Sequence, residues 1–152
     1  MRRCIWTLTA MAVTLSGCAN SSGARMGLFA TTSPILAIVA GEVYTGESTS
    51  YIDGTGTMRL KASLHRKRQC DGDFRFDSQM LGVGSMHCVE GTETLFQFRA
   101  LSTLTGYGFG RSSKGEVRFT YGLTPEQAYP YLRLPPGKKL QTTADGLILV
   151  DS

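Results

Sequence analysis

The sequence contains no apolar run long enough to cross a lipid bilayer as a helix. The longest run, from Cys4 to Leu15, has about a dozen residues, whereas a membrane-spanning helix needs roughly 20. Residues 26–40 are also fairly apolar, but Thr31, Thr32, Ser33 and Pro34 interrupt them. No transmembrane helix is therefore expected.

Motifs for nucleophilic or redox catalysis are also missing. The stretch from Gly84 to His87 lacks the second glycine of a G-x-S-x-G elbow, and the chain has no C-x-x-C pair. His87 and Cys88 are neighbours, but adjacent side chains on a strand point to opposite faces, so they cannot form a dyad there. We therefore expect no catalytic residue.

Metal and cofactor sites are equally weakly indicated. His65, Cys70, His87 and Cys88 match no standard spacing of zinc ligands. "GYGFG" is not the G-x-G-x-x-G loop of nucleotide-binding proteins and is expected to be a glycine-bent strand. No metal and no cofactor are expected.

Acidic pairs could serve as a general acid and base. Asp71 and Asp73 flank one glycine, and Glu90 and Glu93 lie close to another. Nothing in the sequence selects either pair, and the aspartates at Gly72 are interpreted more simply as residues that form a turn.

The N-terminus has the layout of a secretory signal. Met1-Arg2-Arg3 is cationic, the apolar run follows, and the small residues Ser16 and Gly17 end it. A buried N-terminal helix is the alternative, but the run has no polar face, so such a helix would have to be buried on all sides.

Leu15-Ser16-Gly17-Cys18 resembles the lipobox of bacterial lipoproteins. The resemblance covers residues 1–20 and implies that residues 1–17 are a signal peptide. It also implies that Cys18 becomes the first mature residue and carries diacylglycerol, with an acyl chain such as palmitate usually added to its amino group. Two or three chains hold a protein far more firmly than one.

The residue after Cys18 bears on the destination. In this class an aspartate there tends to retain the protein at the inner membrane, and Ala19 stands there instead. The resemblance therefore implies a cell-envelope protein anchored at the outer membrane and facing the periplasm. Residues 18–33, rich in small and polar side chains, are expected to be a lipidated tether.

Charge does not argue for a nucleic-acid partner. The chain carries 16 basic and 12 acidic side chains, and Arg2 and Arg3 leave with the signal. The dense basic run His65-Arg66-Lys67-Arg68 is expected to be a solvated loop or strand edge, with contact to anionic lipid headgroups or cell-wall polymer as the alternative.

Two of the four cysteines are assigned to the N-terminal signal and anchor, which leaves two in the domain. Cys4 lies in the signal and Cys18 is the lipidation site, which leaves Cys70 and Cys88 in an oxidising compartment. They are expected to form a disulfide, with a redox pair or a metal site as the competing interpretations.

Residues 34–152 are expected to form a single β-rich domain. Met58, Leu60, Ala62 and Leu64 alternate with polar residues, which is the period of a half-buried strand. Similar short segments follow at about ten-residue spacing. Glycines inside them, such as Gly82, Gly84 and Gly108, indicate bends or close backbone approach.

One short helix is expected after Thr124, with Pro125 at its first position and Gln127 completing a capping box. The fold class is therefore mainly β: a small antiparallel sandwich or barrel with one short C-terminal helix.

These features favour a non-catalytic binding or envelope-structural module, with the membrane as one partner and a protein or cell-wall polymer as another. The mature domain resembles small uncharacterised proteobacterial envelope lipoproteins, and in style the periplasmic lysozyme-inhibitor lipoproteins, although none of their inhibitory residues carries over. The alternative is a small periplasmic hydrolase or ligand carrier that uses a pocket in the β domain.

Overall fold

A computed structural model describes residues 29–152 of the chain. The predicted signal peptide and Cys18 lie outside the described residues. The strands are β1 (Thr31–Val39), β2 (Glu42–Ser50), β3 (Thr55–Ala62), β4 (Gln69–Phe76), β5 (Leu81–Cys88), β6 (Glu93–Ala100), β7 (Gly106–Ser112), β8 (Gly115–Tyr121), β9 (Lys138–Thr143) and β10 (Gly146–Asp151), with helix α1 (Pro125–Leu132) between β8 and β9.

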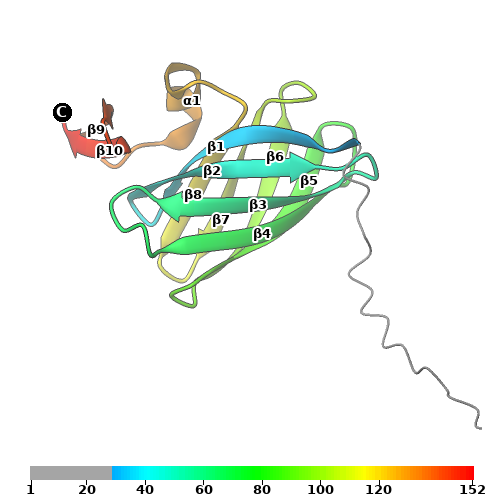
Figure 1. Ribbon diagram of the computed structural model, residues 1–152, viewed down its shortest axis with the longest axis horizontal. Helices are drawn as coiled ribbons and strands as arrows, with labels where there is room; N and C mark the ends of the chain where they lie inside the picture. Colours follow the sequence, from blue (N-terminus) through cyan, green and yellow to red (C-terminus); the bar gives the residue numbers. More distant parts are fainter. Residues whose placement is uncertain (1–28) are drawn as a thin grey trace, which may run out of the picture.

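The first eight strands form a closed antiparallel barrel in chain order, because β8 also pairs with β1 (Figure 1). The prediction of a mainly β protein with one short helix is confirmed, and of the two expected architectures the barrel is the one observed. β1 begins at Thr31, three residues before the expected start of the domain. Closure leaves the barrel without unpaired strand edges.

Alternation along the strands sorts the side chains between the interior and the surface. In β6, every second residue from Thr94 to Ala100 is buried and the residues between are exposed. β3 follows the same rule, with Met58, Leu60 and Ala62 inside. This is the period of two that the sequence predicts. Leu64, which the same pattern placed on the buried face, lies beyond the end of β3 and is 64% exposed, so that part of the prediction is wrong.

Both faces of β1 are buried from Ile35 to Val39. Ile35, Ala37 and Val39 point into the barrel, whereas Leu36 and Ile38 belong to a second, outer cluster. That outer cluster packs β1 and β2 against α1 and the β9–β10 hairpin through Val43, Leu123, Ala128, Leu132, Leu134, Leu140, Leu147 and Leu149. The continuous apolar sequence of β1 is therefore explained by two cores.

Helix α1 begins as the sequence predicts. Thr124 Oγ1 accepts from the Gln127 N–H, the Gln127 side chain accepts from the Thr124 N–H, and Pro125 occupies the first turn. These bonds satisfy amide groups that a helix start otherwise leaves unpaired. At the other end, Arg133 adopts a left-handed conformation (φ 44°) and stops the helix.

The interior is built by phenylalanine rings lying over glycines. Gly82 faces Phe98 on the neighbouring strand, and Gly108 faces Phe119 in the same way. A Cβ atom added to Gly108 would lie 2.3 Å from Cζ of Phe119. The strand glycines therefore make room for rings in a narrow barrel, which is the close approach expected from the sequence.

The barrel has two ends with different chemistry. The entry end, where β1 begins, includes residues 29–30, the loops 51–54, 77–80 and 101–105, and the segment 122–124 that follows β8. The disulfide end consists of the turn 40–41 and the loops 63–68, 89–92 and 113–114. In Figure 1 the entry end is on the right and the disulfide end on the left.

Within residues 29–152, no helix is long and apolar enough to cross a membrane.

Candidate functional site

The barrel interior has no room for a small molecule. The space left between Ile35, Tyr121 and the rings of Phe74, Phe76 and Phe98 is about 20 Å³. Phe98 packs edge-on against Phe74 and Phe76, with ring centroids 5.4 Å and 4.9 Å apart. A single water needs roughly 10–15 Å³, so this space is about the size of one water molecule. This part of the interior is therefore a packed core.

Tyr121 closes this core near the entry end. Its hydroxyl is buried and has no hydrogen-bond partner in the described part of the chain. Burial raises the pKa of Tyr121 to about 12, because an apolar environment disfavours the phenolate. Tyr121 is therefore neutral at physiological pH and is not poised to exchange protons.

Cys70 and Cys88 lie directly opposite each other on β4 and β5, inside the barrel and next to the disulfide end. Their Sγ atoms are 2.02 Å apart, at disulfide distance. Of the sequence-predicted site residues, these two are brought together, and Cys18 lies outside the described residues. His87 points outward beside Glu93, with Nδ1 3.2 Å from Oε1, away from Cys88.

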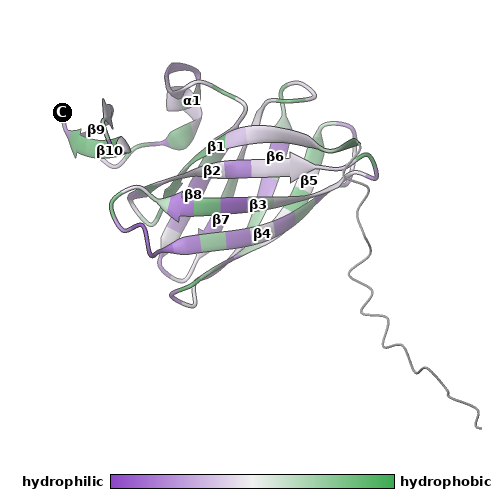
Figure 2. Ribbon diagram, viewed as in Figure 1, coloured by the Kyte–Doolittle hydropathy of each residue, from purple (hydrophilic) through white to green (hydrophobic). Residues whose placement is uncertain are grey.

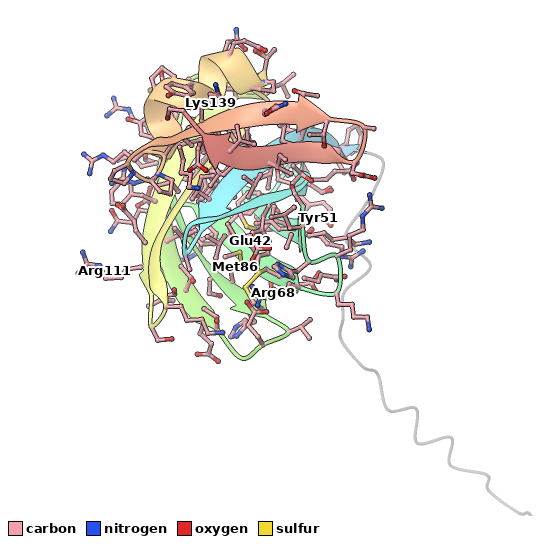
Figure 3. All side chains as sticks on the ribbon, turned by 90° about the vertical axis from the view of Figure 1, so that its left-hand side faces the viewer. Glu42, Tyr51, Arg68, Met86, Arg111 and Lys139 are labelled. Atoms are coloured by element: carbon pink, nitrogen blue, oxygen red, sulfur yellow. A yellow bond between two sulfur atoms is a disulfide. The ribbon has the colours of Figure 1, made fainter. Side chains whose placement is uncertain are left out.

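A cluster of hydrogen bonds and ion pairs between side chains lies at the same end. Arg68 donates from Nη1 to Glu42 Oε2 at 2.8 Å, and His65 Nδ1 lies 2.6 Å from Glu42 Oε1. Figure 3 looks onto this end, with Glu42 and Arg68 beside each other. Arg66 reaches Asp145 in the β9–β10 turn at 3.5 Å. The basic run is thus largely engaged in contacts within the protein, as a surface loop.

A recess of about 160 Å³ opens beside this cluster, lined by Val39, Ala40, Glu42, Tyr44, Arg68, Glu90, Thr92 and Lys114. Burial, followed by the carboxylates of Glu90 and Glu42, raises the pKa of Tyr44 to about 12. The Thr92 hydroxyl is buried without a hydrogen-bond partner among the described residues. The recess is smaller than typical ligand pockets of 300–1,000 Å³.

The expectation that Asp71 and Asp73 form a turn is wrong, because both lie within β4. Gly72 between them faces inward, where an added Cβ would lie 2.6 Å from the Ser85 carbonyl oxygen. Glycine is needed there for strand packing and does not mark a turn. Asp71 accepts from Arg59 and Gln69 on the surface, and these bonds lower the pKa of its carboxyl.

The second acidic pair is also separated. Glu90 lines the recess, whereas Glu93 lies beside His87. Over residues 29–152, no group of three or more His, Cys, Asp or Glu side chains could hold a metal ion.

A broad concave surface lies on the outside of the barrel, across β4 to β8. We call it the arginine face and define it by Arg75, Val83, Leu95, Gln97, Phe109, Arg111 and Arg118. The open depression around these residues is also lined by Arg133 and by the carboxylates of Asp73 and Glu116, which makes four arginines against two carboxylates. It therefore has a net positive charge.

Apolar side chains are displayed at the centre of the arginine face. Leu95 on β6 is 77% exposed, and Phe109 on β7 is 46% exposed. The guanidinium of Arg118 lies 5.3 Å from the centre of the Phe109 ring, a cation–π contact. Arg118 also donates to Glu116.

Two arginines of this face form no ion pair within the described part of the chain, Arg75 and Arg111. Sequence reasoning did not identify the face. The sequence did contain one indication of it. Leu95 and Phe109 are large apolar residues at strand positions that point outward, where the alternating pattern predicts polar residues.

Comparisons of the chain with protein-family models, with curated proteins and with solved structures found no match.

Proposed function

We propose that this protein is a lipid-anchored envelope lipoprotein whose barrel is a non-catalytic binding module. The anchor is Cys18, at the end of the lipobox-like sequence. The observation that carries the binding role is the contrast between a filled interior and an exposed face of apolar and arginine side chains. A module of this kind works with its outer surface.

The arginine face supports a protein partner. Aromatic residues and arginine are enriched at protein interfaces, and Phe109 with Arg118 and Arg111 supplies both on neighbouring strands. Unpaired guanidinium groups favour carboxylates because they bind them in a bidentate manner. The proposed partner therefore presents carboxylates around an apolar patch.

The alternative, a small hydrolase or ligand carrier, would use the recess at the disulfide end. Its buried Thr92 hydroxyl and its mixture of charges favour a polar ligand. The recess, at about 160 Å³, is too small for a ligand of ordinary metabolite size.

Photo-crosslinking in intact cells tests the binding role. A photoreactive amino acid at Leu95 or at Phe109 is expected to give an adduct of higher mass with one partner. The matched control is Glu47, which is exposed on β2, across the barrel from β6. Adducts that form equally at Glu47, or at none of the three positions, would contradict a partner bound to the arginine face.

A further inference from the structure

Large apolar side chains gather at the entry end of the barrel. They come from the segment before β1, from the three loops of that end and from the first residue of β5, and each is exposed to solvent: Phe29, Ile52, Met80, Leu81, Leu101 and Leu104. Figure 2 shows apolar colour in the loops at this end, on the right of the view. Phe29, Ile52 and Met80 border one shared recess. We call these six residues the apolar tip.

The loops that carry the tip are held by hydrogen bonds. The Tyr51 N–H donates to the Thr55 carbonyl at 2.8 Å, and the Leu101 N–H donates to Thr105 at the same distance. Asp53 Oδ1 accepts from the Thr55 N–H at 2.9 Å. These turns project Ile52 and its neighbours outward in a fixed arrangement, because their backbone groups are already satisfied.

The opposite end has a different character. Leu64 and Val89 are exposed there, but they stand among Arg66, Lys67 and Glu90 in the same loops. The entry-end loops contain no lysine or arginine and carry two carboxylates, Asp53 and Asp77. These loops therefore offer no cation to anionic headgroups, and burial of apolar surface is the driving force that they supply.

The apolar tip lies close in the chain to the proposed lipid anchor, which indicates that a membrane covers it. The chain enters the barrel at this end, since β1 begins at Thr31. Only residues 18–28 separate the described part of the chain from the lipid on Cys18. Eleven residues span at most about 40 Å, so the bilayer surface lies within reach of the entry end.

We infer that the apolar tip inserts into the interface of the bilayer that holds the lipid anchor. This inference rests on the proposed lipidation of Cys18 and adds a second, non-covalent contact with the same membrane. Apolar side chains commonly sit about 5–10 Å into the headgroup and acyl-chain boundary. The contact orients the barrel with its disulfide end away from the membrane and leaves the arginine face accessible from the side.

Tryptophan fluorescence tests the insertion. The only tryptophan of the chain is Trp6 in the signal, so Ile52→Trp in a chain of residues 18–152 is a single reporter. Its matched control is Leu95→Trp, because Leu95 is 77% exposed and Ile52 is 79% exposed, and Leu95 lies on the side of the barrel. Each chain also carries Cys18→Ser and an N-terminal hexahistidine tag, which attaches it to phosphatidylcholine vesicles containing a nickel-chelating lipid.

Brominated lipids quench tryptophan only at short range. With bromine near the headgroup end of the acyl chains, Ile52→Trp emission should fall at least about twofold relative to unbrominated vesicles, as expected for interfacial depth. Leu95→Trp emission should change little. Leu104→Trp repeats the measurement in case Ile52→Trp fails to fold, which circular dichroism would reveal.

The inference would be overturned if bromine reduced the emission of the tip reporter no more than the emission of the control reporter. A blue shift of Ile52→Trp that grows with protein concentration in the absence of vesicles would also overturn it, because a second copy would then cover the tip. The tag replaces the lipid, so this test does not depend on modification of Cys18. An unmodified Cys18 in cells would instead contradict the proposed function.

Discussion

Replacing Phe98 with alanine should lower the free energy of unfolding by about 3–5 kcal/mol. Phe98 is buried on β6 and its ring contacts Phe74, Phe76, Phe96 and Tyr121. It also lies over Gly82, which has no side chain to fill the space that the ring would leave. The cavity would therefore persist, and the lost contacts would add to the lost burial.

The matched control is Phe109→Ala on the next strand. Phe109 points outward and is half-exposed, with Arg118 as its ring contact. Its loss should cost less than about 1 kcal/mol. Urea denaturation followed by circular dichroism measures both variants, and similar losses at the two positions would contradict the packed interior.

Loss of both Cys70 and Cys88 is expected to cost about 3 kcal/mol of stability, since the bond closes a loop with a sequence separation of 18 residues. The double Cys→Ala variant, made in a Cys18→Ser chain, contains no thiol in residues 18–152. It should unfold at the same urea concentration with and without reductant. For the parent chain, the urea concentration at which it unfolds should fall to the value of the double variant only when reductant is present.

Thiol labelling provides the independent check on the bond. The denatured, unreduced Cys18→Ser chain should label at neither Cys70 nor Cys88, and should label at both after reduction. Labelling at both positions without reduction would show that the two sulfurs, although adjacent in the barrel, remain thiols in the cell.

The sequence predicts the strands well because each one follows the simple alternation of a barrel wall. Met58, Leu60 and Ala62 face inward as their spacing requires. Helix α1 was also predictable, because Thr124, Pro125 and Gln127 determine its start through local contacts. The disulfide-distance pair was predicted from the cysteine count and from the expected oxidising compartment, without knowledge of the fold.

Features that depend on distant pairing were not predictable. Asp71-Gly72 has the composition of a turn, and only the neighbouring strands show that Gly72 lies in a packed wall. The β9–β10 hairpin covers β1 and β2 with leucines whose partners lie about a hundred residues earlier in the chain. The arginine face and the apolar tip arise because barrel closure brings separate strands and loops to one surface.

The central claim, a barrel anchored through Cys18, is tested most directly by the intact mass of the protein extracted from cell membranes. The account predicts a chain that begins at Cys18 and carries diacylglycerol with an additional acyl group, with all of that mass on the N-terminal peptide. It also predicts that Cys18→Ser abolishes the added mass and releases the protein from the membrane fraction. A chain without lipid at Cys18, with the Cys18→Ser variant fractionating like the parent, would contradict it.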